Sequence, residues 1–212
     1  MKEEWPLLAF LIVMLSFTFL ILNSEMPVIA QTKHNAPIGE IHSSITVGQT
    51  FLCTENNLNR IDVLLATYAR INTEDVIFHL REWNSSQDLV KIVVNAKEIK
   101  DNSYHVFRFE PIRDSRGKMY YFFIESPNST PGNAITVWYS TEDVYENGVT
   151  YLNHKPVSGD LHFRVYCKSN INLVISNFTS RIQQDKPFFM FYFLLLILIL
   201  SIIIIYVKNR PK

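Results

Sequence analysis

The chain has 212 residues, of which 48% are hydrophobic, and its 20 basic and 20 acidic residues give a formal net charge of zero. This length allows one domain of ordinary size or two small ones. Because no basic excess is present to contact a phosphate backbone, we expect no nucleic-acid partner. The hydrophobic residues gather in two blocks near the ends, whereas the middle has the composition of a globular domain.

The first hydrophobic block, residues 7–22, contains no charged residue. We predict that residues 1–23 form a transmembrane signal-anchor and that residues 24–37 form a polar tether. A cleaved signal peptide is the alternative, because residues 28–30 resemble a small-residue cleavage site. Against cleavage, Glu3 and Glu4 lie in a leading region that is normally positive in signal peptides.

The second block, residues 187–207, is also free of charge and has the length of about 20 residues that a bilayer-spanning helix needs. Aromatic residues lie at both of its ends, as is typical of the membrane interface. We therefore predict a connector at 169–186, a transmembrane helix at 187–207 and a basic cytoplasmic tail at 208–212. By the positive-inside rule, this places the protein in the cell membrane with its central domain extracytoplasmic.

Residues 38–168 show period-two alternation in short runs broken by turn residues, which is typical of antiparallel sheets with one buried face. In the clearest run, Leu161, Phe163 and Val165 alternate with polar residues. Residues 118–125 are apolar on both faces and are expected to form a central strand. Residues 88–99 read as a strand followed by a helical turn. The prediction is an all-β antiparallel sandwich, jelly-roll-like, since no long amphipathic helix separates the runs.

The two cysteines, Cys53 and Cys167, lie on the predicted inward faces of an early strand and of the last strand. An exported domain folds where disulfides persist, and we therefore expect these two residues to form a disulfide. Two unpaired buried thiols, acting as small hydrophobic groups, are the alternative.

Motifs for catalysis and metal binding are missing from the sequence. It contains no HExxH, CxxC or GxSxG motif and no glycine-rich phosphate loop. We therefore predict no catalytic residues, no metal site and no cofactor, although a structural calcium ion remains open without assignable ligands. A glycan hydrolase is the enzymatic alternative, because paired carboxylates can come from separate strands.

Aromatic residues in loops, at strand ends and on outward faces give a binding signal. Sugars present flat C–H faces that stack on Trp and Tyr rings while polar neighbours take the hydroxyls. The loop at 140–156 combines both residue types. The alternative is that these rings pack under loops or cover the second sheet. The candidate ligand-binding residues are Trp83, Trp138, Tyr145, Tyr151 and Tyr166.

Three sequons mark candidate glycosylation sites, at Asn84, Asn128 and Asn177. The first two lie in predicted turns. They matter only in a host that glycosylates exported proteins.

Six segments of the middle domain together resemble a known kind of module. They are residues 48–51, 58–68, 76–82, 120–127, 131–138 and 159–166. This pattern resembles membrane-anchored jelly-roll modules of bacterial and archaeal envelope proteins, which are carbohydrate-binding or galactose-binding-like. The resemblance implies a β-sandwich that binds a glycan. Some of these modules accompany polytopic glycosyltransferase-type proteins, whereas here the module has no fused enzyme.

The sequence thus favours a non-catalytic module that binds a glycan or a surface polymer. The alternative is a structural or assembly subunit that binds a membrane protein partner, such as a glycosyltransferase-like protein.

Overall fold

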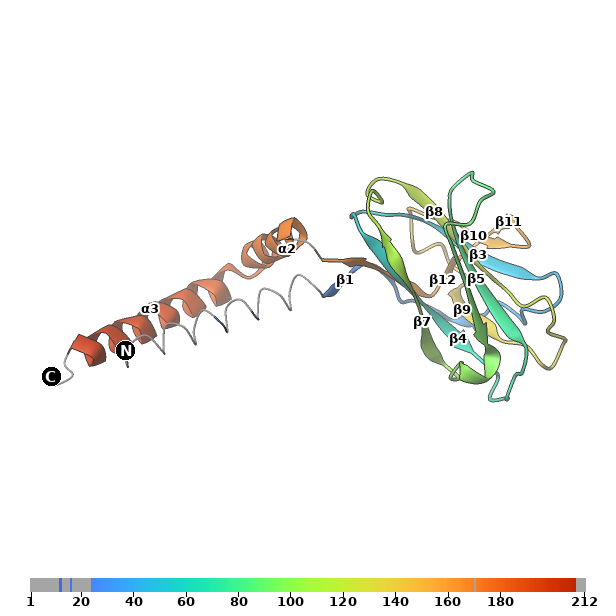
Figure 1. Cartoon of the computed structure of the whole chain (residues 1–212), viewed down its shortest axis with the longest axis horizontal. Helices are drawn as coiled ribbons and strands as arrows, with labels where there is room; N and C mark the ends of the chain where they lie inside the picture. The colour runs from blue at the N-terminus through green and yellow to red at the C-terminus, as the bar shows by residue number, and fades with distance from the viewer. Residues whose placement is uncertain (1–11, 13–15, 17–23, 170, 209–212) are drawn as a thin grey trace. The chain divides into compact units, whose positions relative to one another are not determined.

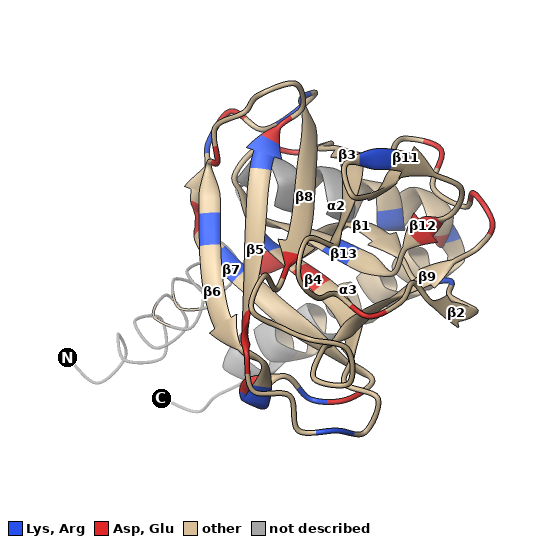
Figure 2. Cartoon of the chain, turned by 90° about the vertical axis from the view of Figure 1, so that its right-hand side faces the viewer, with Lys and Arg blue, Asp and Glu red and all other residues tan. Residues whose placement is uncertain are grey.

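A computed structural model describes residues 12, 16, 24–169 and 171–208. The chain forms two compact units, Asn23–Ser169 on the one hand and Met1–Leu22 with Asn170–Lys212 on the other. The first unit contains two antiparallel sheets and confirms the predicted sandwich-like β fold (Figure 1). Charged residues of both signs are spread over its strands in the view of Figure 2, in keeping with the zero net charge.

The first sheet has seven strands and is built around β4 (Leu58–Ala66), which pairs with β7 (Ser103–Ile112) on one side. On its other side β4 pairs with both β13 and β9. The bounds of the other strands are β1 (Glu25–Gln31), β13 (Phe163–Lys168), β9 (Thr136–Ser140), β12 (Asp160–Leu161) and β2 (Ala36–Pro37).

The second sheet has six strands in the order β11-β10-β3-β8-β5-β6. Its centre is β8 (Met119–Glu125), apolar on both faces as predicted, which pairs with β3 and β5. The other strands are β3 (Thr46–Leu52), β5 (Asp75–Glu82), β6 (Val90–Asn95), β10 (Thr150–Leu152) and β11 (Lys155–Val157). A 3₁₀ turn, η1 (Ala96–Glu98), follows β6, so the prediction of a strand and a helical turn is confirmed.

The core lies between the sheets, where the alternating residues of facing strands meet. Phe78 of β5 stacks on Phe107 of β7 at 4.2 Å between ring centroids, and Phe51, Phe122 and Phe163 form a second ring cluster. All five rings are fully buried. Since each buried aromatic side chain removes a large apolar area from water, these contacts account for much of the force that holds the sheets together.

The expected tether at 24–37 instead contains β1 and β2. β1 pairs along its length with β13. Its Ile29 faces inward and is 8% exposed, while Pro27 and Ala30 face solvent. This alternation is short and interrupted by a register shift, which hides it in the sequence. The expected connector at 169–186 contains the helix α2 (Ile171–Gln184), followed by α3 (Lys186–Lys208).

The prediction of flanking transmembrane helices is corrected by the structure. Within the described residues, no helix combines the length and the apolar character that a membrane crossing demands. The membrane and signal-anchor assignments lose their support accordingly. Residues 1–23 lie outside the described part of the chain, apart from Ile12 and Ser16.

Candidate functional site

Two of the five predicted aromatic residues come together on the outer face of the second sheet. Trp83 follows β5 and Tyr151 lies in β10, yet their ring centroids are 5.3 Å apart. The backbone N–H of Trp83 donates to the backbone carbonyl of Met119 at 2.8 Å, which fixes the turn after β5 beside β8. The Trp83 side chain remains 38% exposed, and an aromatic ring of this kind on a surface is available to a ligand.

These two rings border a hollow of about 420 Å³. Its apolar wall comes from Met119 and Val149, and its polar groups come from Thr50, Glu146 and Asn147. A concave site that joins aromatic rings with a few polar groups has the general character of a small-ligand pocket. We call it the aromatic hollow.

A third ring that the sequence analysis did not single out supports this pair. Tyr121 of β8 meets Tyr151 edge-on at 5.3 Å and Trp83 edge-on at 6.0 Å. Tyr121 and Phe123 lie over Gly48 of β3, where an added Cβ would come within 2.6 Å of the Tyr121 ring. The absence of a side chain at Gly48 therefore lets the rings lie against the backbone. The apolar outer face of residues 118–125 was the only sequence signal for Tyr121.

The loop that forms one wall of the aromatic hollow is anchored to a buried carboxylate. Asp160 is 1% exposed, and its Oδ2 accepts hydrogen bonds from the backbone N–H groups of Val144 and Tyr145 at 2.7 and 2.8 Å. Its Oδ1 accepts a bond from Gln49. Further along, the Val149 N–H donates to Thr50 Oγ1 at 2.8 Å. The loop is thus held at both ends, which makes the hollow's wall pre-formed.

The same loop borders a second hollow, also of about 420 Å³, which we call the β1 hollow. Its lining includes Val28 and Ala30 of β1, Leu52 at the end of β3, and the polar residues Lys33 and Thr54. Asn147 lines both hollows.

Tyr145, a predicted ligand-binding residue, is turned mostly toward the core. Its ring meets Phe163 edge-on at 5.6 Å, and burial raises the pKa of its hydroxyl to about 12. It contributes one part of the β1 hollow's lining, but it lies outside the lining of the aromatic hollow.

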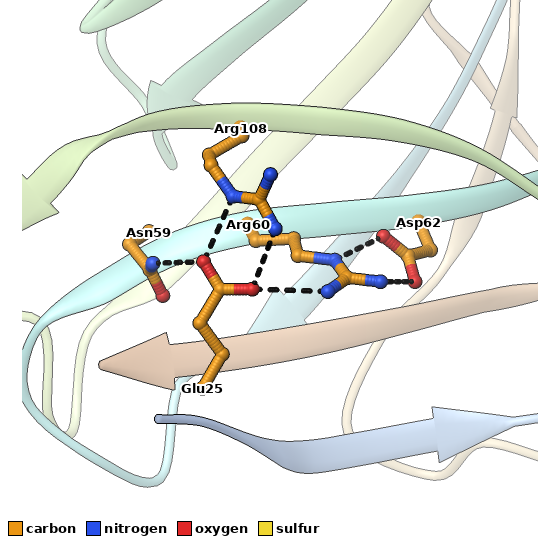
Figure 3. A network of polar contacts seen from close by, with 5 residues as sticks. All are labelled: Glu25, Asn59, Arg60, Asp62 and Arg108. Carbon is orange, nitrogen blue, oxygen red and sulfur yellow. Dashed lines mark hydrogen bonds and ion pairs between the residues drawn. The ribbon is translucent and has the colours of Figure 1, made fainter. Parts of the chain in front are cut away.

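Tyr166 lies on the outer face of the first sheet, where Arg60 lies over its ring. Arg60 belongs to a closed network of charges (Figure 3). The Arg60 guanidinium lies 4.2 Å from the Tyr166 ring centroid and binds both oxygens of Asp62 at 2.7 Å. Glu25 of β1 accepts hydrogen bonds from Arg60, from Arg108 and from Asn59. The two bonds from Arg108, outweighing burial, lower the pKa of Glu25 to about 2.

Trp138 lies elsewhere on the same sheet, beside two histidines. Its Nε1 donates to Asn102 Oδ1 at 2.8 Å, and its ring lies 5.2 Å from that of His34. The His34 and His162 Nδ1 atoms are 2.7 Å apart, and Tyr104 is hydrogen-bonded to the other ring nitrogen of His162. Burial, followed by the charges of neighbouring His34 and Arg164, lowers the pKa of His162 to about 4.

Cys53 and Cys167 meet in the core as free thiols, both fully buried. The backbone carbonyl of Glu55 accepts from both sulfur atoms, at 3.1 Å and 3.7 Å. The hydrogen bond between the thiols lowers the pKa of Cys53 to about 7 and raises that of Cys167. The predicted disulfide is therefore not formed in the structure, which has the alternative of two unpaired buried thiols.

The candidate glycosylation sites Asn84 and Asn128 are exposed, and Asn84 directly follows Trp83 in a turn with φ of 71°. Asn177 lies within α2, and its side chain is outside the described part. Among the described residues, no group of three or more His, Cys, Asp or Glu side chains is arranged to hold a metal ion.

One cluster of ionisable groups accompanies the aromatic rings. His79, stacked on Phe123 at 4.3 Å, has Nδ1 2.8 Å from Asp88 and Nε2 3.3 Å from Glu125. Asp88 also accepts from Arg81, and these bonds outweigh burial and lower the pKa of Asp88. Since Asp88 is already paired with Arg81 and His79, the cluster has the character of a structural ion network.

No protein-family model matches the chain, and a search of the curated proteins finds none that is significantly similar.

Proposed function

We propose that the β-sandwich is a non-catalytic module that binds a glycan or a surface polymer in the aromatic hollow. The observation that carries the proposal is the Trp83–Tyr151 pair, 5.3 Å between centroids, at the edge of a hollow that also offers Glu146 and Asn147. The C–H faces of a sugar ring stack on such aromatic rings, and its hydroxyls bond to carboxylate and amide groups.

The rigidity of the site supports the same proposal. Tyr121 backs both rings, and Asp160 and Thr50 hold the loop that carries Glu146 and Asn147. A ligand that enters a pre-formed site loses little free energy to ordering of the protein. The resemblance to envelope modules of the carbohydrate-binding type points in the same direction.

The test is retention of the purified protein on a panel of insoluble neutral polysaccharides, including a glucan, a galactan, a mannan and chitin. We expect measurable retention on one of them and a loss of about tenfold or more in Trp83→Ala and Tyr151→Ala, as for an aromatic hot spot of ~1.4 kcal/mol or more. Trp138→Ala is the matched control, because it removes the same ring from the other sheet.

Retention of Trp83→Ala at the wild-type level would contradict the proposal, as would absence of retention across the panel. Cross-linking to one stoichiometric protein in native material would instead favour the alternative of an assembly subunit.

A further inference from the structure

The aromatic hollow and the β1 hollow lie on either side of the loop at 144–149. Both have a volume of about 420 Å³, and Asn147 lines both. Thr50 of the aromatic hollow and Leu52 of the β1 hollow are two apart on β3 and therefore point to the same face of the strand. The hollows are thus neighbours that share Asn147 in their linings.

The loop between them is fixed rather than free to close over one hollow. Gly148 has no room for a side chain, because an added Cβ would lie 2.0 Å from the Thr50 carbonyl oxygen. With the Asp160 bonds to Val144 and Tyr145 at the other end, the loop keeps the two hollows open side by side. A ligand that fills one hollow therefore meets the second without any movement of the protein.

The charge of the linings indicates what kind of ligand fits. Glu146 is the one acid in the lining of the aromatic hollow, and Lys33 is the one basic residue in that of the β1 hollow. The two together carry no net charge, so a polyanion gains nothing from electrostatic attraction. A neutral chain can use both groups as hydrogen-bond partners.

On these grounds, and resting on the proposed function, we propose that the ligand is an extended neutral oligosaccharide that crosses Asn147 and occupies both hollows. The aromatic hollow supplies stacking for one part of the chain. The β1 hollow supplies hydrogen bonds from Lys33, Thr54 and Asn147 for the next part. Because the second contact is made within one molecule, it strengthens binding of long chains without affecting short ones.

The experiment measures affinity by isothermal titration calorimetry for oligomers of glucose, galactose, mannose and N-acetylglucosamine with one, two, four and six units, with a polyuronate as the anionic arm. The wild-type protein is expected to bind six units about tenfold or more tightly than two. The double variant Lys33→Ala/Thr54→Ala is expected to lose that gain for six units and to keep wild-type affinity for two. Both side chains are exposed, so the fold should tolerate the change.

Lys155→Ala, an exposed lysine in β11 outside both linings, is the matched control and should bind as the wild type does. Equal affinity for two and six units, or an unchanged double variant, would overturn the extended ligand while leaving the proposed function in place, provided that Trp83→Ala weakens the binding of short oligomers. Preference for the polyuronate would overturn the neutral class. If no oligomer binds, both proposals fall.

Discussion

The outer faces of the two sheets differ in the side chains that they group together. On the first sheet, Arg60 and Arg108 donate hydrogen bonds to Glu25 and Asp62, and Asp62 is 2% exposed. On the second sheet, Trp83 and Tyr151 contact each other but leave a hollow in front of them. Charges that satisfy one another position strands, whereas rings with one open face can take a ligand. The difference lies in what is left unpaired.

Both outer faces belong to one compact unit, and the thiol pair between the two sheets tests this most strongly. Cys53 follows β3 of the second sheet and Cys167 lies in β13 of the first. We expect a disulfide in protein refolded with a low-molecular-weight disulfide oxidant. The two thiols give up two electrons and two protons, and the oxidant leaves as two thiols. Closing so long a loop should stabilise the fold by about 4 kcal/mol.

Urea unfolding with and without reductant measures this effect, and mass spectrometry after alkylation in denaturant counts the thiols. The double variant Cys53→Ser/Cys167→Ser should be insensitive to reductant. Two alkylated cysteines in the oxidant-treated protein would contradict the disulfide.

Arg60→Ala disrupts the charge network on the outer face of the first sheet. It leaves the Asp62 carboxylate buried without its bidentate partner and removes one of the donors to Glu25. Loss of one partner from a buried ion pair should lower the free energy of unfolding by about 3 kcal/mol, measured in urea. Lys118→Ala, which breaks the exposed Lys118–Glu82 pair, should have a much smaller effect, because solvent screens an exposed ion pair. Similar losses in the two variants would show that the network is not stabilising β1 as described.

Gly48→Ala disturbs the aromatic rings on the outer face of the second sheet. The new methyl group would lie 2.5 Å from the Phe122 carbonyl oxygen and against the Tyr121 ring, so the rings behind the aromatic hollow must shift. Overpacking of this kind costs about 1–3 kcal/mol. Thermal unfolding should show the loss, together with weaker polysaccharide retention than wild type. A stable variant with full retention would mean that the position of Tyr121 is irrelevant to the hollow.

The alternation of single strands was readable from the sequence, because inward residues such as Ile61, Phe78 and Phe163 recur every second position and are all buried. The segment at 140–156, which combines aromatic and polar residues, supplies Glu146, Asn147 and Tyr151 to the hollow, although Tyr151 lies in β10 and not in a loop. Both signals are local, since each depends only on neighbouring positions.

What sequence did not reveal depends on long-range pairing. β1 was predicted as a tether, since its partner β13 lies at the other end of the domain. The union of Trp83 with Tyr151 depends on β10 and β5 flanking the same pair of central strands. The inward turn of Tyr145 depends on Asp160, whose buried carboxylate holds the loop backbone from a distant strand.

The smallest expected effect is the pH dependence of the stability that Glu25 contributes to the charge network of the first sheet. Because the folded-state pKa of Glu25, about 2, is below its usual 4.5, its ionised form stabilises the fold above pH 4.5, and this contribution is lost as the pH falls toward 2. Solvent screening of a partly exposed carboxylate limits the contribution to about 1 kcal/mol. The difference in unfolding free energy between wild type and Glu25→Gln should therefore shrink from pH 5.5 to pH 2.5. Glu142→Gln, on an exposed loop, should show no such convergence, and polysaccharide retention by Glu25→Gln at neutral pH should equal that of the wild type. A constant difference across this range would mean that Arg108 and Arg60 do not hold Glu25 as an ion. The charge network would then not distinguish the outer face of the first sheet from that of the second.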